Sequence, residues 1–141
     1  MKPQLKCVML IDDDNMTNFM NKIIIDEAEI TKTIIRKYSG NSAFAYLSDS
    51  VSKDYLPFPD LVFVDLEMPD GNGWDFIERY NVEKENFPIT PIIIMLTTCK
   101  QSDTVVRAGA IKEISALHLK PLTHEILSTI MTNYFPKSFH Q

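Results

Sequence analysis

The sequence has few cysteines, no long apolar run and no excess of basic residues. Only two of its 141 residues are cysteines. Cys7 lies in an apolar run, so we expect a buried core residue rather than a ligand or half of a disulfide, and two unpaired thiols fit a reducing, intracellular setting. The formal net charge is −5, which argues against a broad nucleic-acid-binding face, because such a face is basic. No apolar stretch approaches the roughly 20 residues of a membrane span.

The beginning of the chain does not have the pattern of a signal peptide. Its basic start, Met1 to Lys6, is followed by only five apolar residues and then by three aspartates. An apolar run of this length is too short for the core of a signal peptide. We therefore expect a cytoplasmic protein. A length of 141 residues predicts one domain over 1–141, with a core over about 5–134 and a short tail over 135–141.

Strand-like and helix-like segments alternate along the chain. We expect strands over 6–11, 31–37, 60–65, 92–96 and 114–119, and helices over 15–28, 40–50, 73–85, 101–111 and 123–134. The segment 31–37 is β-branched and partly polar, as is typical of an edge strand, and 51–59 is expected to be a loop because it contains Pro57 and Pro59. This alternation predicts an α/β fold of the (βα)5 type, with a doubly wound, five-stranded parallel sheet and helices on both faces.

Four of the expected strands end in polar residues that suit one kind of site. The first is followed by Asp12, Asp13 and Asp14, the third ends in Asp65, the fourth is followed by Thr97 and the fifth by Lys120. In a parallel α/β sheet the binding site lies outside the carboxyl ends of the strands. Carboxylates gathered at one edge repel each other and need a cation, so the pattern predicts a site for Mg²⁺ and phosphate.

Each of these residues has a suitable chemical role. Asp12, Asp13 and Asp65 offer the oxygen ligands that Mg²⁺ prefers. A carboxylate is also a nucleophile towards phosphorus, and Asp65 is the best candidate because it stands at the centre of the edge. Thr97 can donate a hydrogen bond to a phosphoryl oxygen, and Lys120 can supply a positive charge. Asp14 is expected to be a turn former or the N-cap of the following helix.

The motifs around these residues match a known family. They are Ile11–Asp14, then Val64–Gly73 with its Asp-x-x-Met-Pro and following glycines, then Met95–Thr98, and finally Lys120–Leu122. Together they make the chain resemble a response-regulator receiver domain over about residues 5–134. The resemblance implies the flavodoxin-like strand order 2-1-3-4-5.

The resemblance also implies roles at the phosphorylation site. Asp65 would be the phosphoacceptor, and Thr97 and Lys120 would contact the phosphoryl group. The bond between Lys120 and Pro121 would be cis, as it is in the family. Pro69 and the segment 71–73 would shape the loop that follows Asp65.

For the metal, the resemblance implies a Mg²⁺ ion held by Asp12, Asp13 and Asp65. The backbone carbonyl of Glu67 would complete its ligands.

The chain departs from the family at the switch position. An aromatic residue is frequent three positions before the lysine, and here that position is Leu117. Thr98 stands where a small residue is usual, and Cys99 stands beside the site, two residues after Thr97.

The resemblance implies a signalling protein rather than an enzyme, apart from self-phosphorylation and self-dephosphorylation. The expected partners are a sensor histidine kinase or phosphotransfer protein and an unknown downstream protein, with no nucleic acid and no membrane. On the first helix, Met16, Phe19 and Met20 recur at helical spacing. They are interpreted either as core residues or as a docking surface near the site.

Two other functions compete with this interpretation. A haloacid-dehalogenase-type phosphatase could use Asp12 and Asp14 as its Asp-x-Asp pair, but only Glu125 is available after Lys120 to complete its metal site. Turnover of a phosphate ester would favour it. A receiver-like interaction module that takes no phosphate is the second alternative, and a lack of response to Mg²⁺ and a phosphodonor would favour that. An EF-hand is excluded, because neither acidic run has the required glycine at position six.

Overall fold

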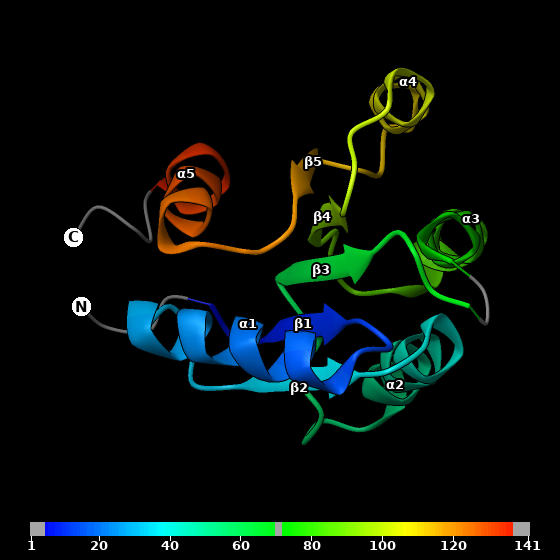
Figure 1. Ribbon diagram of the computed structural model, residues 1–141. Helices are drawn as coiled ribbons and strands as arrows, with labels where there is room; N and C mark the ends of the chain where they lie inside the picture. The colour runs from blue at the N-terminus through cyan, green and yellow to red at the C-terminus, as the bar shows by residue number, and fades with distance from the viewer. Residues whose placement is uncertain (1–4, 70–71, 137–141) are drawn as a thin grey trace.

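In the computed structural model, residues 5–69 and 72–136 are described, and they form a parallel sheet between two layers of helices (Figure 1). The elements are β1 (Val8–Ile11), α1 (Asn15–Ala28), β2 (Ile34–Lys37), α2 (Gly40–Ser52), β3 (Leu61–Asp65), α3 (Gly73–Glu83), a 3₁₀ turn (Lys84–Asn86), β4 (Ile92–Thr97), α4 (Ser102–Ala110), β5 (Ala116–Leu119) and α5 (His124–Tyr134). The strand order is β2-β1-β3-β4-β5, with neighbouring strands parallel. The predicted fold and strand order are therefore confirmed.

The sheet is covered on both faces, because alternate residues of each strand point to opposite sides. In β1, Val8 and Leu10 pack with residues of α1 and α5, whereas Met9 and Ile11 pack with residues of α2, α3 and α4. Figure 1 shows the same division, with α1 and α5 on one side of the sheet and the other three helices opposite. Cys7 is fully buried between these layers, as predicted.

Several element boundaries differ from the sequence-based expectation, and two of these differences, at the ends of α2 and α3, have a clear structural cause. The expected loop over 51–59 starts later, because α2 continues to Ser52 and the Lys53 N–H still donates to the Asp49 carbonyl at 3.1 Å. The helix expected over 73–85 ends at Glu83 and tightens into the 3₁₀ turn. There Phe87 packs against the rings of Phe44, Phe58 and Tyr80, which draws the chain towards the core.

The edge strand is shorter than expected. Within the predicted range 31–37, only Ile34–Lys37 pair continuously with β1, and Thr31 makes an isolated bridge with Leu5. Of the loop expected to be shaped by 71–73, residues 70 and 71 lie outside the described residues, as does the tail from 137 to 141. Within the described ranges, no helix is both long enough and apolar enough to span a membrane.

The first helix turns an unexpected face to the sheet. Its buried residues are Asn18, Asn21 and Ile25, whereas Met16, Phe19 and Met20 are 63%, 47% and 53% exposed. The interpretation of these three apolar residues as core is therefore wrong. The reason is that two asparagines occupy the inward positions, and at least one of them bonds to the ends of the strands.

Candidate functional site

The register of the strands brings the predicted site residues to one end of the sheet, where the strands have their carboxyl ends. This end is called the site edge. The last residue of β1 pairs with Val64, so the next residues, Asp12 and Asp65, are neighbours at the carboxyl ends of β1 and β3. The strand order reverses between these two strands, which is where doubly wound folds place their sites. Thr97 ends β4 and pairs with the last residue of β5, so Lys120 follows at the same edge.

Three carboxylates meet at this edge. Asp12, Asp13 and Asp65 each offer an oxygen atom, and these atoms all lie within 4.8 Å of one another. Asp12 and Asp65 are buried, at 3% and 2% exposure, while Asp13 is exposed. A compact set of carboxylate oxygens that is open to water on one side matches what Mg²⁺ requires, since Mg²⁺ takes few protein ligands and retains several waters. The donor set therefore fits this metal.

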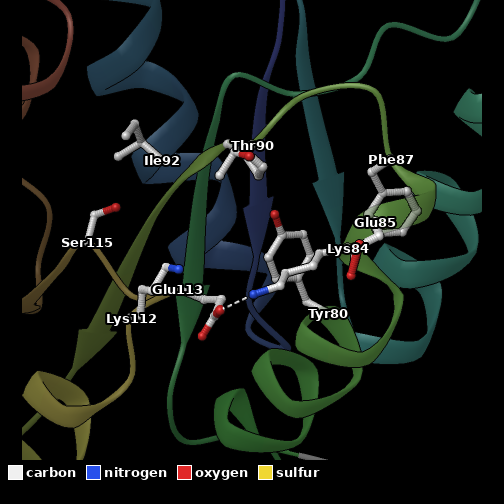
Figure 2. A pocket seen from close by; sticks show the side chains of 10 residues that line it. Tyr80, Lys84, Glu85, Phe87, Thr90, Ile92, Lys112, Glu113 and Ser115 are labelled. Atoms are coloured by element: carbon white, nitrogen blue, oxygen red, sulfur yellow. Dashed lines mark hydrogen bonds and ion pairs between the residues drawn. The ribbon is translucent and has the colours of Figure 1, made fainter.

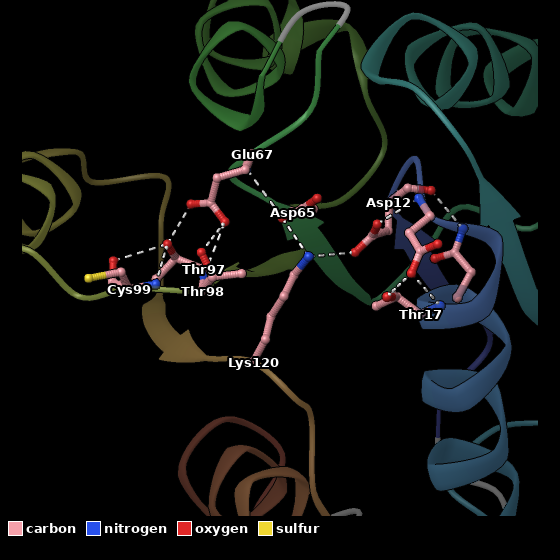
Figure 3. A network of polar contacts seen from close by, with 10 residues as sticks. Asp12, Thr17, Asp65, Glu67, Thr97, Thr98, Cys99 and Lys120 are labelled. Carbon is pink, nitrogen blue, oxygen red and sulfur yellow. Dashed lines mark hydrogen bonds and ion pairs between the residues drawn. The ribbon is translucent and has the colours of Figure 1, made fainter.

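The lysine lies between the two buried carboxylates. The Lys120 Nζ is 3.0 Å from Asp12 Oδ2 and 2.8 Å from Asp65 Oδ1, and Figure 3 shows its side chain reaching across the edge of the sheet to both. Burial alone would lower the pKa of Lys120, but its hydrogen bonds to Asp65 and Asp12 outweigh burial and raise it. The ammonium group therefore stays charged at neutral pH. The Lys120–Pro121 peptide bond is cis, as predicted.

Asp65 is a weaker acid than an ordinary aspartate. Burial raises its pKa to about 6, and the charge of Asp12 raises it too, while Lys120 and the Glu67 N–H act in the opposite direction. The Glu67 N–H donates to Asp65 Oδ1 at 3.2 Å. At neutral pH the carboxylate is still ionised for the most part, and it is only thinly solvated. Both properties suit a nucleophile.

Asp14 has the structural role that its position predicts. It is the N-cap of α1, and its carboxylate accepts from the Thr17 N–H at 3.2 Å and from the Thr17 hydroxyl. Its side chain is therefore engaged at the start of α1 rather than beside Asp12. This geometry argues against the Asp-x-Asp pair of a haloacid-dehalogenase-type phosphatase.

Thr97 has a partner that the sequence did not reveal. Its hydroxyl donates to Glu67 Oε2 at 2.5 Å, and the Thr98 N–H and hydroxyl donate to the other oxygen of Glu67, at 3.0 Å and 3.3 Å. The predictions for Glu67 placed its backbone carbonyl and its carboxylate at the metal, not at the end of β4. Nothing in the spacing of these residues indicates that the carboxylate turns towards the end of β4, because that choice depends on a side-chain rotamer.

Asn18 is a second residue that sequence reasoning missed. It is fully buried, and its amide nitrogen donates to the carbonyls of Asp12 at 3.0 Å and Lys37 at 3.2 Å. It thus joins the carboxyl ends of β1 and β2 and supports the backbone that carries Asp12. In the sequence, an asparagine on an amphipathic helix is typical of the solvent-facing side, so no signal pointed to this role.

The three remaining predicted positions lie around the end of the sheet near α4. Leu117 on β5 is half-buried and packs against the core cluster under α2, α3 and α4. It also lines a cavity of about 250 Å³ with Val105 and Ala108 of α4. Thr98 and Cys99 are exposed in the connection after β4.

A larger cavity lies at the opposite edge of the sheet. It has a volume of about 530 Å³ and is lined by residues at the end of α3 and at the starts of β4 and β5. Figure 2 shows Lys84 and Glu113 paired within it, and its other charged residues, Glu85 and Lys112, are also of opposite sign. This lining has as many basic as acidic residues, unlike the three carboxylates gathered at the carboxyl ends of the strands.

Comparison with known proteins identifies the family of the chain. The sequence matches the response regulator receiver domain family over residues 8–132. A two-component response regulator from Cytophaga hutchinsonii has a similar structure, with 26% identity, a TM-score of 0.83 and coverage of 98% of this chain and 99% of that one. No curated protein matches the chain.

Two further solved structures share the fold. A response regulator receiver protein from Dyadobacter fermentans is 21% identical, with a TM-score of 0.76 and coverage of 92% of this chain and 98% of that one. The Vibrio cholerae chemotaxis protein CheY4 is 19% identical, with a TM-score of 0.74 and the same coverage. The chain belongs to the response regulator receiver domain family, whose members are signalling modules of two-component systems.

Proposed function

We propose that this receiver domain accepts a phosphoryl group on Asp65 from a phosphohistidine, with Mg²⁺ as cofactor, and passes the signal on through contacts with other proteins. The observation that carries the proposal is the placement of Lys120 Nζ between the buried carboxylates of Asp12 and Asp65, at 3.0 Å and 2.8 Å. In this proposal residues 1–141 are one receiver domain, and self-phosphorylation and self-dephosphorylation are its only chemistry.

The transfer is a displacement at phosphorus. An oxygen of the Asp65 carboxylate forms a bond to the phosphorus atom while the bond from phosphorus to the partner's imidazole nitrogen breaks. The electron pair of that bond stays on the imidazole, which leaves as a neutral group after taking up a proton from water. The product is an aspartyl phosphate. Asp65 is ready for this step at neutral pH because its pKa, although raised, is about 6.

The residues around Asp65 position and neutralise charge, which is most of what phosphoryl transfer requires. Lys120 donates to an oxygen of the incoming group, and the Thr97 hydroxyl donates to another. Asp12, Asp13 and Asp65, with the backbone carbonyl of Glu67, would hold Mg²⁺, which when bound supplies the positive charge that offsets repulsion between carboxylates and phosphate.

Phosphorylation adds a charge of about −1.5 to −2, which draws Thr97 towards Asp65 and turns Lys120 from the carboxylate to the phosphoryl group. Because Thr97 ends β4 and Lys120 follows β5, the connections to α4 and α5 shift with them. The outcome is a change in the populations of two arrangements of this face. Leu117 stands in this region where the family frequently has an aromatic residue, so a bulky ring takes no part in the change.

The exposed apolar residues of α1 are the proposed docking surface for the phosphohistidine donor, a sensor histidine kinase or phosphotransfer protein. Met16, Phe19 and Met20 are 47% to 63% exposed, and the helix begins directly after the aspartates of the site. Replacing Phe19 by glutamate should slow transfer from a phosphorylated donor protein and leave uptake from acetyl phosphate unchanged. Val82→Glu, at a position 78% exposed on α3, is the control; equal slowing by both variants would contradict the docking surface.

Intact-mass spectrometry tests the proposed chemistry. The native protein, incubated with phosphoramidate and Mg²⁺, should gain the mass of one phosphoryl group, and EDTA should prevent the gain. Asp65→Asn should gain nothing, whereas Asp54→Asn, at an exposed position, should behave as the native chain does. No gain in the native protein from either phosphoramidate or a phosphorylated donor protein would instead favour an interaction module that takes no phosphate.

A further inference from the structure

The carboxylate of Glu67 binds the end of β4 rather than the site beside it. One of its oxygens accepts from the Thr97 hydroxyl at 2.5 Å, and the other accepts from the Thr98 N–H at 3.0 Å and from the Thr98 hydroxyl at 3.3 Å. Figure 3 shows Glu67 turned towards these threonines and away from Asp65. The bonds join the segment after β3 to the segment after β4.

The bond to Thr97 occupies the only proton that its hydroxyl can donate. Thr97 is 1% exposed, so water cannot readily replace a partner that it loses. Its oxygen accepts from the Cys99 N–H at 3.3 Å, and the Cys99 carbonyl, at 3.2 Å, is a weaker alternative acceptor. A charged acceptor at 2.5 Å is the stronger partner. The hydroxyl can therefore serve Glu67 or a group bound at Asp65, but not both.

We propose that Glu67 is a positioning residue that holds the Thr97 hydroxyl away from Asp65, so that a phosphoryl group must displace Glu67 to gain this hydrogen bond. This inference rests on the proposed function. It gives Glu67 a restraining role in which its side chain sets how much of the protein is ready to receive phosphate. Only molecules in which Glu67 has released Thr97 can bind the phosphoryl group with full affinity. The smaller their fraction, the lower the apparent affinity.

The same bonds make the change cooperative. Glu67 holds Thr97 through one oxygen and Thr98 through the other, so release of the carboxylate frees both residues together. A phosphoryl group on Asp65 also brings negative charge close to Glu67, which lies only two residues further along the chain, and this repulsion favours release. The segments after β3 and β4 are thus tied together before phosphorylation and separate after it.

The affinity for beryllium fluoride with Mg²⁺, a non-covalent mimic of the phosphoryl group, measures this competition. The tryptophan fluorescence of Trp74, the single tryptophan of the chain, can follow the titration. Glu67→Ala should bind the mimic about threefold to tenfold more tightly, because the Thr97 hydroxyl then gives up only the weaker Cys99 carbonyl and the net gain is that of an ordinary hydrogen bond. Glu67→Gln should fall between native and alanine, because an amide oxygen is a weaker acceptor. Glu85→Ala, an exposed glutamate near the opposite edge of the sheet, should bind as the native protein does.

A double-mutant cycle separates competition for the hydroxyl from simple repulsion of charge. In a Thr97→Val background, the gain from Glu67→Ala should disappear, because no hydroxyl remains to be released. A gain that persists in this background would show that Glu67 acts only by its charge and would overturn the proposal. The proposal would also be overturned if Glu67→Ala, with Thr97 unchanged, bound the mimic no more tightly than the native protein does.

The Thr97 side chain provides an independent measurement in the absence of any ligand. Scalar couplings across its Cα–Cβ bond should report one rotamer in the native protein and an average over several in Glu67→Ala. A single unchanged rotamer in both would contradict the restraint. If the native protein neither binds the mimic nor takes up phosphate, the proposed function itself fails. Native binding without a gain in Glu67→Ala defeats only the restraining role.

Discussion

Replacing Asp65 by asparagine should stabilise the metal-free protein at neutral pH. The carboxylate is 2% exposed, and burial raises its pKa from 3.8 to about 6. Folding therefore costs free energy whenever this group is ionised. Asparagine keeps the shape of the side chain and removes the charge, so the variant escapes this cost while phosphate uptake is lost.

The size and the pH range of the effect follow from proton linkage. The folded pKa lies above the unfolded one, so the native protein has its full stability from this group below about pH 4 and loses it as the pH rises to about 6. A rise of about two pKa units corresponds to about 3 kcal/mol. Asp65→Asn should thus match the native protein near pH 4 and exceed its free energy of unfolding by up to about 3 kcal/mol above pH 6.

Urea unfolding in EDTA, measured from pH 4 to pH 8, tests this reasoning. Asp54→Asn provides the control, since Asp54 is exposed, and it should change the free energy of unfolding by less than about 0.5 kcal/mol. A difference between native and Asp65→Asn that does not depend on pH would refute the argument. So would a variant that is less stable than the native protein above pH 6, because the bond to Lys120 would then outweigh the cost of burial.

Four further changes should alter stability in predictable ways. Lys120→Met leaves two buried carboxylates without their cation and should cost about 3 kcal/mol in metal-free urea unfolding, with Mg²⁺ restoring more stability than it adds to the native protein. Gly73→Ala places a Cβ 2.8 Å from the Asp65 carbonyl oxygen and should lower the free energy of unfolding by about 1–3 kcal/mol. By contrast, Gly109→Ala, where a Cβ meets nothing within 4 Å, should raise it by about 0.5–1 kcal/mol. Asn18→Leu removes the side-chain donor to the Asp12 carbonyl and one of the two donors to the Lys37 carbonyl, and it should cost about 1–3 kcal/mol by the same assay; an unchanged urea unfolding curve would contradict its role.

The fold could be predicted because most strands are recognisable from a few consecutive residues. Continuous apolar runs such as 7–11 and 92–96 are typical of strands buried on both faces, and the helices between them fall at regular intervals. Topology then brings the strand ends together, which is why Asp12, Asp65 and Lys120 could be grouped before any contact was known. The ends of the helices and strands could not be predicted as closely. The end of α3, for example, depends on where Phe87 packs in three dimensions.

The site could be predicted only as a set of residues at one edge. Which way each side chain turns depends on rotamers and on packing between distant segments. For that reason, nothing in the sequence indicated that the Glu67 carboxylate accepts hydrogen bonds from Thr97 and Thr98. The face of α1 was wrongly interpreted for a related reason. Apolar periodicity marks a stripe on a helix, but in the first half of α1 the inward positions belong to Asn18 and Asn21. The apolar residues Met16, Phe19 and Met20 of the same half are exposed.

The most direct test of the account is to identify the phosphorylated residue chemically. Borohydride reduces an acyl phosphate to an alcohol but leaves a free carboxylate intact, so it marks the aspartate that carried the phosphoryl group. After treatment with phosphoramidate and Mg²⁺, followed by borohydride and peptide mass spectrometry, the reduced residue should be at position 65 alone, and EDTA should abolish it. Reduction at Asp12 or Asp13, or no reduction in a protein that does bind Mg²⁺, would contradict the account.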